Sequence, residues 1–375
     1  MSNNTQPEIR FPGFTEDWEQ RKLGDFIDVK SGKDYKHLNS GSIPVYGTGG
    51  YMLSVDRALS DIDAIGIGRK GTIDKPYLLK APFWTVDTLF YAVPKQNIDL
   101  QFSLSIFKKI NWKKFDESTG VPSLSKTVIN SVGASVPSYE EQQKIGSFFK
   151  QLDETIALDQ RKLDLLKETK KGFLQKMFPK NGAKVPEIRF PGFTKDWEER
   201  KLGDVFSERS ERSSEGELIS VTINSGVIKA SELDRKDNSS DNKSNYKKVE
   251  VGDIAYNSMR MWQGASGYSS YEGILSPAYT VIIPKEGTDS KFFAYDFKRY
   301  DMIQTFKRNS QGLTSDTWNL KFPTLKLVKI MVPSIEEQKQ IAAFFERLDN
   351  TIALHERELD VLKETKKGFL QKMFV

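Results

Sequence analysis

The chain has 375 residues, contains no cysteine and carries a formal net charge of +5 at pH 7. This length accommodates two or three domains, and the absence of cysteine excludes disulfide frameworks, thiolate metal sites and cysteine nucleophiles. No apolar run is long enough to cross a membrane and the N-terminus lacks an apolar signal region, so we expect a cytoplasmic protein with no membrane partner.

An entry segment occurs twice in the chain. Residues 7–25 read PEIRFPGFTEDWEQRKLGD, and residues 186–204 read PEIRFPGFTKDWEERKLGD. The two copies differ only where a glutamate is replaced by Lys195 and a glutamine by Glu199. A repeat of this length within one chain indicates a duplicated domain rather than a short-period solenoid.

After each entry segment comes a body whose sequence is not repeated. Short aromatic and β-branched stretches separated by glycine predict small antiparallel sheets. The glycine-rich segment 47–50 lacks the loop-then-helix context that would cradle phosphates, and segment 66–71 lies between predicted strands and is interpreted as a hairpin turn rather than a nucleotide site. Short helices are expected at 101–109 and 290–306, and the polar tract 234–248 predicts a surface loop.

A longer repeat closes each half. Residues 137–178 return as residues 333–374 with about 30 of about 42 positions identical. Ser138 and Glu141 have the spacing of a capping box, and the second copy repeats it. Neither run contains an internal proline, so each predicts a helix of about 40 residues and about 60 Å.

Both predicted helices carry apolar residues at alternating steps of three and four, which is typical of a coiled coil. These seam residues are Ile145, Phe149, Leu152, Ile156, Leu163 and Leu166 in the first helix, and Ile341, Phe345, Leu348, Ile352, Leu359 and Leu362 in the second. A stripe of this length needs a partner, and each helix is the obvious partner of the other. The seam is interrupted by polar residues, namely Asp159, Lys170, His355 and Lys366. They either fix the register or lie where the helices diverge into solvent.

The order of these segments predicts the domain organisation. We expect a domain at 1–136, a helix at 137–178, a linker at 179–185, a second domain at 186–332 and a second helix at 333–375. Because the linker is short, a two-fold relation between the halves would bring the end of the second helix to the first entry segment, in a ring-like arrangement. Only an antiparallel helix pair satisfies this relation. The predicted fold class is therefore α+β, with two β-rich domains joined by two long antiparallel helices.

No catalytic or metal-binding constellation accompanies these elements. The sequence lacks the phosphate-binding GxxxxGK[ST] loop, the metal-binding HExxH motif and the [DN]PP[YFW] motif of amino methylation. Its histidines, His37 and His355, are far apart in the sequence. We therefore expect neither an enzyme nor a bound metal or cofactor in this chain.

Basic, amide and hydroxyl side chains interleaved with aromatic residues favour DNA binding, because these groups contact base edges and phosphates. The candidates in the first domain are Arg69, Lys70, Thr72, Lys75, Trp84, Ser123 and Lys126. Those in the second domain are Asn257, Arg260, Trp262, Gln263, Arg308, Gln311, Thr314 and Trp318. A core position is the alternative for each tryptophan. The loops that begin at Ser118 and Ser310 precede the last strand of each body, which strengthens their assignment.

Several motifs together carry a family resemblance. They are PSxEEQxxI at 137–145 and 333–341, LDxxIAL at 152–158 and 348–354, WxxRKLGD at 18–25 and 197–204, GRKGTID at 68–74, and VGDIAYNSMRMWQGASG at 251–267. With these motifs the chain resembles, along essentially its whole length, the DNA specificity subunits of type I restriction–modification enzymes.

The resemblance implies a bipartite mode of DNA recognition. Each target recognition domain would read one half of an asymmetric double-stranded site, and the helices would set the spacer. The helices would also dock two adenine methyltransferase subunits, which carry S-adenosylmethionine and extrude the target base. ATP and Mg²⁺ would belong to motor and nuclease subunits. The alternatives are a coiled-coil scaffold that does not bind DNA and a stand-alone nuclease or transferase.

Overall fold

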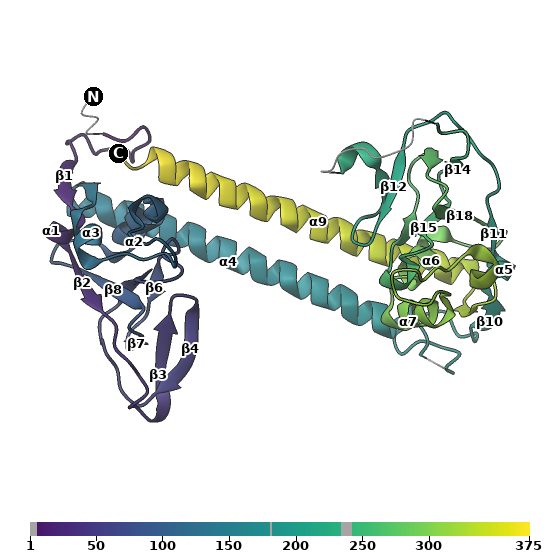
Figure 1. Cartoon of the computed structure of the whole chain (residues 1–375), viewed down its shortest axis with the longest axis horizontal. Helices are drawn as coiled ribbons and strands as arrows, with labels where there is room; N and C mark the ends of the chain where they lie inside the picture. The colour runs from purple at the N-terminus through teal and green to yellow at the C-terminus, as the bar shows by residue number, and fades with distance from the viewer. Residues whose placement is uncertain (1–5, 181, 234–241) are drawn as a thin grey trace. The chain divides into compact units, whose positions relative to one another are not determined.

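The computed structural model describes residues 6–180, 182–233 and 242–375. The chain forms two compact units (Figure 1). The first comprises Met1–Arg161 with Glu356–Val375, and the second comprises Lys162–His355. Each unit therefore holds one β-rich body and a segment of both long helices. None of the helices in the described ranges combines the length and the apolar character that a membrane-spanning segment needs.

Each body starts and ends on a two-stranded ribbon. In the first unit, β1 (Glu19–Lys22) pairs antiparallel with β9 (Gly133–Val136). In the second, β10 (Glu198–Lys201) pairs in the same way with β19 (Lys329–Val332). The short helices α1 (Leu23–Phe26) and α5 (Leu202–Val205) follow the first strand of each ribbon. The ribbon thus ties every entry segment to the residues that lead into a long helix.

The first body contains two small sheets. The four-stranded sheet has the antiparallel order β2 (Ile27–Ser31), β8 (Leu89–Pro94), β5 (Ala64–Gly68), β6 (Tyr77–Leu79). The three-stranded sheet has the order β4 (Gly50–Val55), β3 (Ser40–Gly47), β7 (Trp84–Thr85). The helices are α2 (Leu100–Lys109), a 3₁₀ helix at Trp112–Phe115, and α3 (Lys126–Ser131). The predicted hairpin at 66–71 joins β5 to β6, and the glycine-rich segment 47–50 joins β3 to β4.

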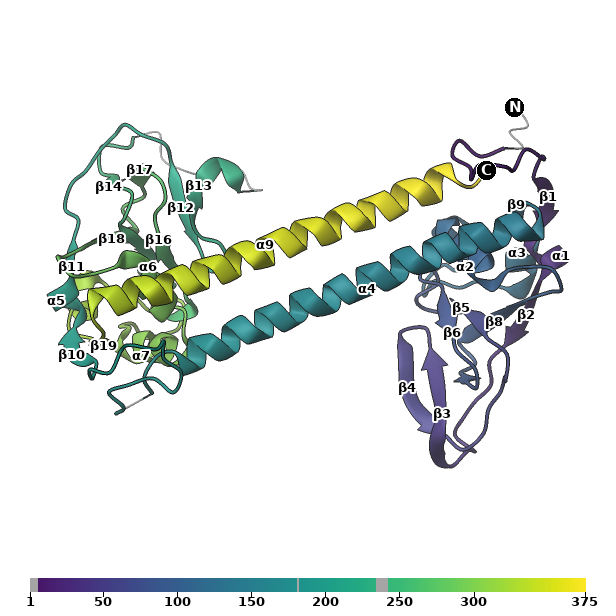
Figure 2. The ribbon, with the colours of Figure 1, turned by 180° about the vertical axis from the view of Figure 1, so that it is seen from behind.

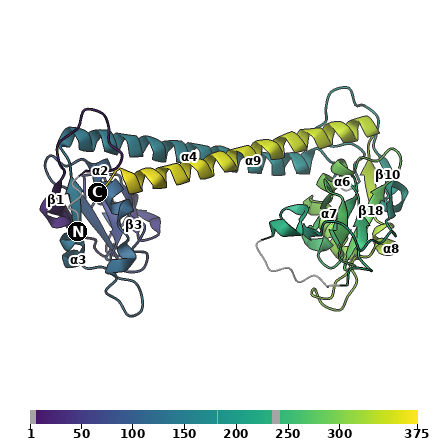
Figure 3. The same cartoon turned by 90° about the horizontal axis from the view of Figure 1, so that it is seen from above.

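The second body has the same kind of four-stranded sheet. Its order is β11 (Phe206–Glu208), β18 (Tyr279–Pro284), β15 (Ile254–Asn257), β16 (Ser266–Tyr268). The two-stranded pairs are β12 (Ile219–Thr222) with β13 (Gly226–Lys229), and β14 (Lys247–Val249) with β17 (Gly273–Leu275). The helices are α6 (Ser290–Asp296), α7 (Tyr300–Asn309), α8 (Phe322–Leu325), and 3₁₀ turns at Ala230–Glu232 and Met261–Gln263. Figure 3 shows α6, α7 and β18 of this unit from above.

Local predictions were wrong at three places in the bodies. The single helix expected at 290–306 is two helices, because Arg299 takes an extended conformation that begins α7. The loop entering β9 contains α3, whose first turn is capped by the Ser125 hydroxyl accepting from Val128 N at 3.2 Å. Part of the polar tract, 234–241, lies outside the described residues. Its end is strand β14, since Val249 is fully buried in the core of the second body.

The long helices are α4 (Tyr139–Lys176) and α9 (Ile335–Lys372). The Ser138 hydroxyl accepts from Glu141 N at 3.4 Å, as predicted for the start of α4. A capping box also predicts that the Glu141 side chain reaches back to the backbone of the cap residue, and this part of the prediction is wrong. The buried Glu141 carboxylate instead accepts both hydrogen bonds of a bidentate pair from Arg10, at 2.8 Å each. This pair fastens the entry segment to the helix start.

The two long helices are antiparallel within each unit, as expected. Figure 2 shows α4 and α9 as ribbons. In the first unit, the rings of Phe148 and Phe369 lie 5.0 Å apart and Asp153 pairs with Lys366. In the second, the rings of Phe173 and Phe344 lie 5.0 Å apart and Lys170 pairs with Asp349. Lys170 and Lys366 therefore form ion pairs between the helices, which supports a role in register.

Burial divides the seam residues into two groups. Ile145, Phe149, Leu163, Ile341, Phe345 and Leu359 are buried. Leu152, Ile156, Leu166, Leu348, Ile352 and Leu362 are half-buried. The residues near the start of each helix pack into a globular core as well as against the other helix.

The end of each long helix meets an entry segment. Phe374 lies 6.1 Å from the ring of Trp18, and Ile9 N donates to Lys372 O at 3.0 Å. In the second unit Phe178 lies 6.1 Å from Trp197. The C-terminal residues thus contact the first entry segment, as the two-fold relation predicted.

Candidate nucleic-acid interface

Two loops of the first body that were predicted to face DNA lie side by side. We call residues 68–74 and 116–126 the first loop pair. Gly71 N donates to Pro122 O at 2.8 Å, and Leu124 N donates to Arg69 O at 2.9 Å. These bonds join segments about fifty residues apart in the sequence into one surface.

A cleft of about 510 Å³ opens on this surface. Arg69, Lys70, Lys126 and Glu117 all contribute to its lining. The Arg69 guanidinium lies 5.9 Å from the ring of Phe90, and the Glu117 carboxylate accepts from a backbone amide at 2.8 Å. Three cations beside one carboxylate form a surface that suits phosphate oxygens and the exocyclic amine of a base.

The remaining candidates of the first body differ in exposure. Ser123 pairs with Lys70 in an isolated antiparallel bridge. Lys75 is exposed and Thr72 is half-buried, both on the first loop pair or directly after it. The interpretation of Trp84 as a DNA contact is wrong and the core alternative holds. Its side chain is buried, and its Nε1 donates to Lys33 O at 2.8 Å.

The second body brings together the corresponding loops. We call residues 257–264 and 310–319 the second loop pair. Leu320 N, next to the second loop, donates to Ser258 O at 2.8 Å. The rings of Trp262 and Trp318 meet edge to face with 5.2 Å between centroids. Both rings are half-buried, so these tryptophans are neither core residues nor fully exposed.

A cation lies over this aromatic pair. The Lys307 Nζ is 6.0 Å from the Trp262 ring and 5.6 Å from the Trp318 ring. Lys307 was missed in the sequence because its role depends on the two rings that surround it. The combination offers stacking faces and positive charge together.

The other candidates of the second body lie on its two loops, apart from Arg308, which lies near the end of α7. Arg308, Gln311 and Thr314 are exposed, whereas Asn257, Arg260 and Gln263 are half-buried. The Asn257 side chain accepts from Met259 N at 3.0 Å, and the Arg308 Nη2 donates to Thr305 Oγ1 at 3.0 Å. These bonds orient the side chains while leaving further donors on each.

Lys298 holds one loop of the second loop pair through hydrogen bonds to backbone carbonyls, and no sequence motif indicated this role. Its Nζ donates to Gly264 O at the end of the Trp262 turn and to Ile223 O in the β12–β13 turn. Burial, together with the nearby positive charge of Lys170, lowers the pKa of Lys298 to about 8. One lysine therefore holds two turns that are distant in the sequence.

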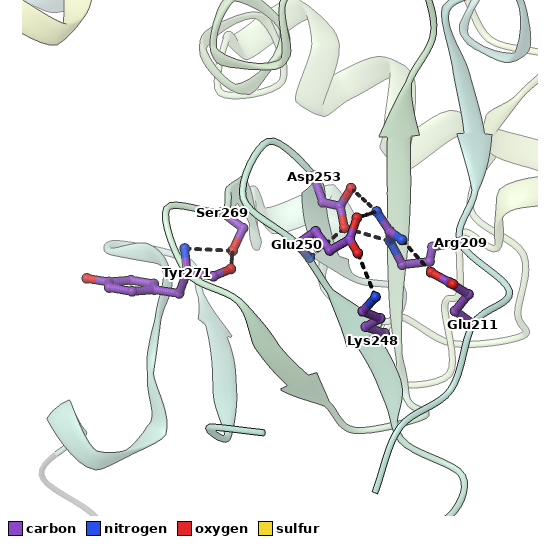
Figure 4. A network of polar contacts seen from close by, with 7 residues as sticks. All are labelled: Arg209, Glu211, Lys248, Glu250, Asp253, Ser269 and Tyr271. Carbon is purple, nitrogen blue, oxygen red and sulfur yellow. Dashed lines mark hydrogen bonds and ion pairs between the residues drawn. The ribbon is translucent and has the colours of Figure 1, made fainter. Parts of the chain in front are cut away.

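A buried arginine organises the opposite part of the second body (Figure 4). Arg209 donates to Asp253 at 2.7 and 2.9 Å, to Glu250 at 2.8 Å and to Glu211 at 2.7 Å. Its side chain is 6% exposed, and hydrogen bonding to Asp253 raises the pKa of the guanidinium. The matching position of the first body by the entry repeat is Lys30, which is exposed. The clamp thus belongs to one body and could not be found from the repeat.

Among the residues that the structure describes, no group of histidine and acidic side chains is arranged to hold a metal ion. The polar residues gathered at the two loop pairs are mainly hydrogen-bond donors and cations. Their chemistry is that of binding an anionic, base-bearing partner.

Comparison with known proteins agrees with this chemistry. A family model described as the type I restriction modification DNA specificity domain matches residues 15–168 and 194–364. The type I restriction enzyme MjaVIII specificity subunit of Methanocaldococcus jannaschii is 23% identical over 404 residues, covering 95% of this chain and 91% of that protein. The MjaIX specificity subunit of the same organism is 34% identical over 94 residues, covering 25% of this chain and 21% of that protein.

A solved structure shares the fold. The crystal structure of the S subunit of the type I restriction–modification system from M. genitalium matches with a TM-score of 0.68 at 16% identity, covering 99% of both chains. A chain from a study of complex assembly and conformational transition in the type I system matches with a TM-score of 0.52 at 16% identity, covering 98% of this chain and 99% of the other. The family model accounts for both repeated halves. The chain therefore belongs to the DNA specificity subunits of type I restriction–modification systems, with two copies of the specificity domain.

Proposed function

We propose that each body reads one half of a bipartite, asymmetric site in double-stranded DNA through its loop pair. The observation that carries this proposal is the contrast between repeated and unrepeated parts. Both bodies have the same ribbon and helix attachments, yet the first loop pair presents Arg69 and Lys70 where the second presents the Trp262–Trp318 pair. Different side chains on equivalent supports suit two readers of different base sequences.

We further propose that the repeated parts dock two identical methyltransferase subunits. Arg10 pairs with Glu141, and Arg189 pairs with Glu337 in the same bidentate geometry. Both helices also expose aliphatic residues at repeat-related positions: Leu158 and Leu354 at 53%, Leu165 at 67% and Val361 at 59%. Equivalent surfaces of this kind suit two copies of one partner.

The chemistry would then reside in the partner subunits. The methyltransferases would carry S-adenosylmethionine, and motor and nuclease subunits would use ATP and Mg²⁺. This chain would supply sequence choice and, through the helix lengths, the spacer between the half-sites. Because the proposed target is cellular DNA, we expect the complex in the cytoplasm.

Methylome sequencing of cells that express this chain with its cognate methyltransferase tests the proposal. The expected result is a bipartite motif with one modified adenine in each half, on opposite strands. A stable complex that shows no DNA binding would instead favour the scaffold alternative. Methylation by the chain alone would favour the enzyme alternative.

Replacing Arg69 by alanine tests the first loop pair. A bidentate arginine–base contact contributes about 1–3 kcal/mol, so the affinity for the cognate site should fall about 5- to 150-fold. Binding would be measured on DNA with the cognate sequence and with the first half-site scrambled, and only the cognate affinity should fall. Lys80→Ala is the matched control, because Lys80 is 67% exposed in the same body and pairs with Asp63 at 2.6 Å. An equal loss in both variants would contradict a specific role for Arg69.

A further inference from the structure

The two loop pairs share one feature although their sequences differ. The first contains Ser118-Thr119-Gly120-Val121, and the second contains Ser310-Gln311-Gly312-Leu313. The aliphatic residue that ends each segment is exposed, Val121 at 55% and Leu313 at 101%. Burying such a side chain normally stabilises a protein, so each loop leaves unused apolar surface at its tip.

Hydrogen bonds close both loops on either side of the exposed aliphatic residue. In the second body, Gln311 and Asn319 exchange two backbone hydrogen bonds of 3.0 and 2.8 Å that close the loop below Leu313. Gly312 has a φ of +149°, and a Cβ there would lie 2.7 Å from the Thr317 backbone. The glycine therefore allows the tight approach that holds Leu313 outward.

In the first body, a carboxylate rather than a backbone pair closes the loop below its exposed tip residue. The Asp116 carboxylate accepts from Ser123 N at 2.9 Å and from Ser118 N at 3.0 Å, on either side of Val121. These backbone hydrogen bonds lower the pKa of Asp116, so its carboxylate stays ionised at neutral pH. The neighbouring Pro122 carbonyl accepts from Gly71, the residue after Lys70. An apolar tip thus projects beside a basic segment.

We propose that Val121 and Leu313 are wedges that enter the base stack beside the adenine to be methylated in each half-site. This inference rests on the proposed function. The two half-sites differ in sequence, but both require one adenine to leave the helix before its amino group can react. Apolar side chains inserted between base steps stabilise such unstacked DNA. A shared aliphatic tip suits this shared step, whereas base reading requires side chains that differ.

The test uses the complete complex of this chain with its methyltransferase on DNA that carries the bipartite site. With 2-aminopurine in place of one target adenine, fluorescence reports extrusion, and single-turnover methylation is measured on unmodified DNA. Leu313→Ser should slow extrusion and methylation about tenfold or more in the second half-site only, since the apolar contact that the leucine would make within the base stack is lost. Val121→Ser should do the same in the first half-site only.

A weakened target base pair supplies the decisive comparison. Placing a mismatched base opposite the target adenine lowers the cost of extrusion, so both serine variants should methylate this DNA at the wild-type rate. Ile62→Ser and Val251→Ser are matched controls, with side chains 61% and 54% exposed in the same two bodies, and should behave as wild type. The proposal that Val121 and Leu313 act as wedges would be overturned if the serine variants still methylated mismatched DNA slowly. It would also be overturned if they methylated fully paired DNA at the wild-type rate. Wild-type methylation of the site tests the proposed function separately, and its absence would overturn both.

Discussion

Replacement of Phe345 by glutamate should unfold the second unit and abolish methylation by the complex. Phe345 is fully buried, with its ring 5.1 Å from Tyr295, 5.3 Å from Phe344 and 6.3 Å from Phe178. A carboxylate at this position loses its hydration without gaining a partner, and the aromatic contacts are lost as well. A cost above about 4 kcal/mol is a large part of the 5–15 kcal/mol that typically stabilises a domain.

Thermal or urea unfolding followed by circular dichroism measures this effect. Ala343→Glu is the matched control, because Ala343 is exposed two residues earlier on the same helix. The control should unfold at the wild-type midpoint. An unfolding midpoint of Phe345→Glu equal to that of the wild type would contradict the packing of α9 into the second body. Phe149→Glu makes the equivalent test in the first unit.

Replacement of Arg209 by methionine should destabilise the second body by about 3–5 kcal/mol, the usual effect of leaving one partner of a buried ion pair uncompensated. Asp253 is only 2% exposed and would lose both hydrogen bonds of its bidentate pair. Because the first unit has its own core, recognition of the first half-site should persist while recognition of the second is lost. Methylation of DNA that carries each half-site variant reports this difference.

Two further variants separate the buried pair from its exposed neighbours. Lys248→Met removes an ion pair to Glu250 in which the lysine is 42% exposed, so the unfolding midpoint should hardly change. The double variant Arg209→Met/Asp253→Leu replaces the pair by apolar side chains and should regain most of the stability lost in the single variant. A single variant as stable as wild type would show that the clamp does not stabilise the body.

Equivalent pairs in the repeated parts explain why the overall plan could be predicted from the sequence. The long helices follow from a local period of three and four residues, and the matching entry segments require matching supports. Phe374 on Trp18 and Phe178 on Trp197 are two copies of one contact. A repeated sequence predicts such contacts because identical side chains in identical neighbourhoods pack alike.

The bodies were less predictable. Trp84 was a candidate DNA contact with a core position as the alternative, and its indole lies in the core, where Nε1 donates to Lys33 O. Glu141 satisfied a capping pattern, yet Arg10 from the entry segment holds its carboxylate. In each case a partner distant in the sequence overrides the local pattern.

By itself, the amino-acid sequence determined the duplicated plan, the long helices, their antiparallel pairing and the loops that carry the candidate DNA contacts. Those features depend on period, repeat and chain length, which are local or arithmetic properties. Only the tertiary structure decided which loops meet, how Lys298 and Arg209 brace the second body, and that Val121 and Leu313 stand exposed. Those features depend on contacts between residues far apart in the chain, whose energies exist only once the fold brings them together.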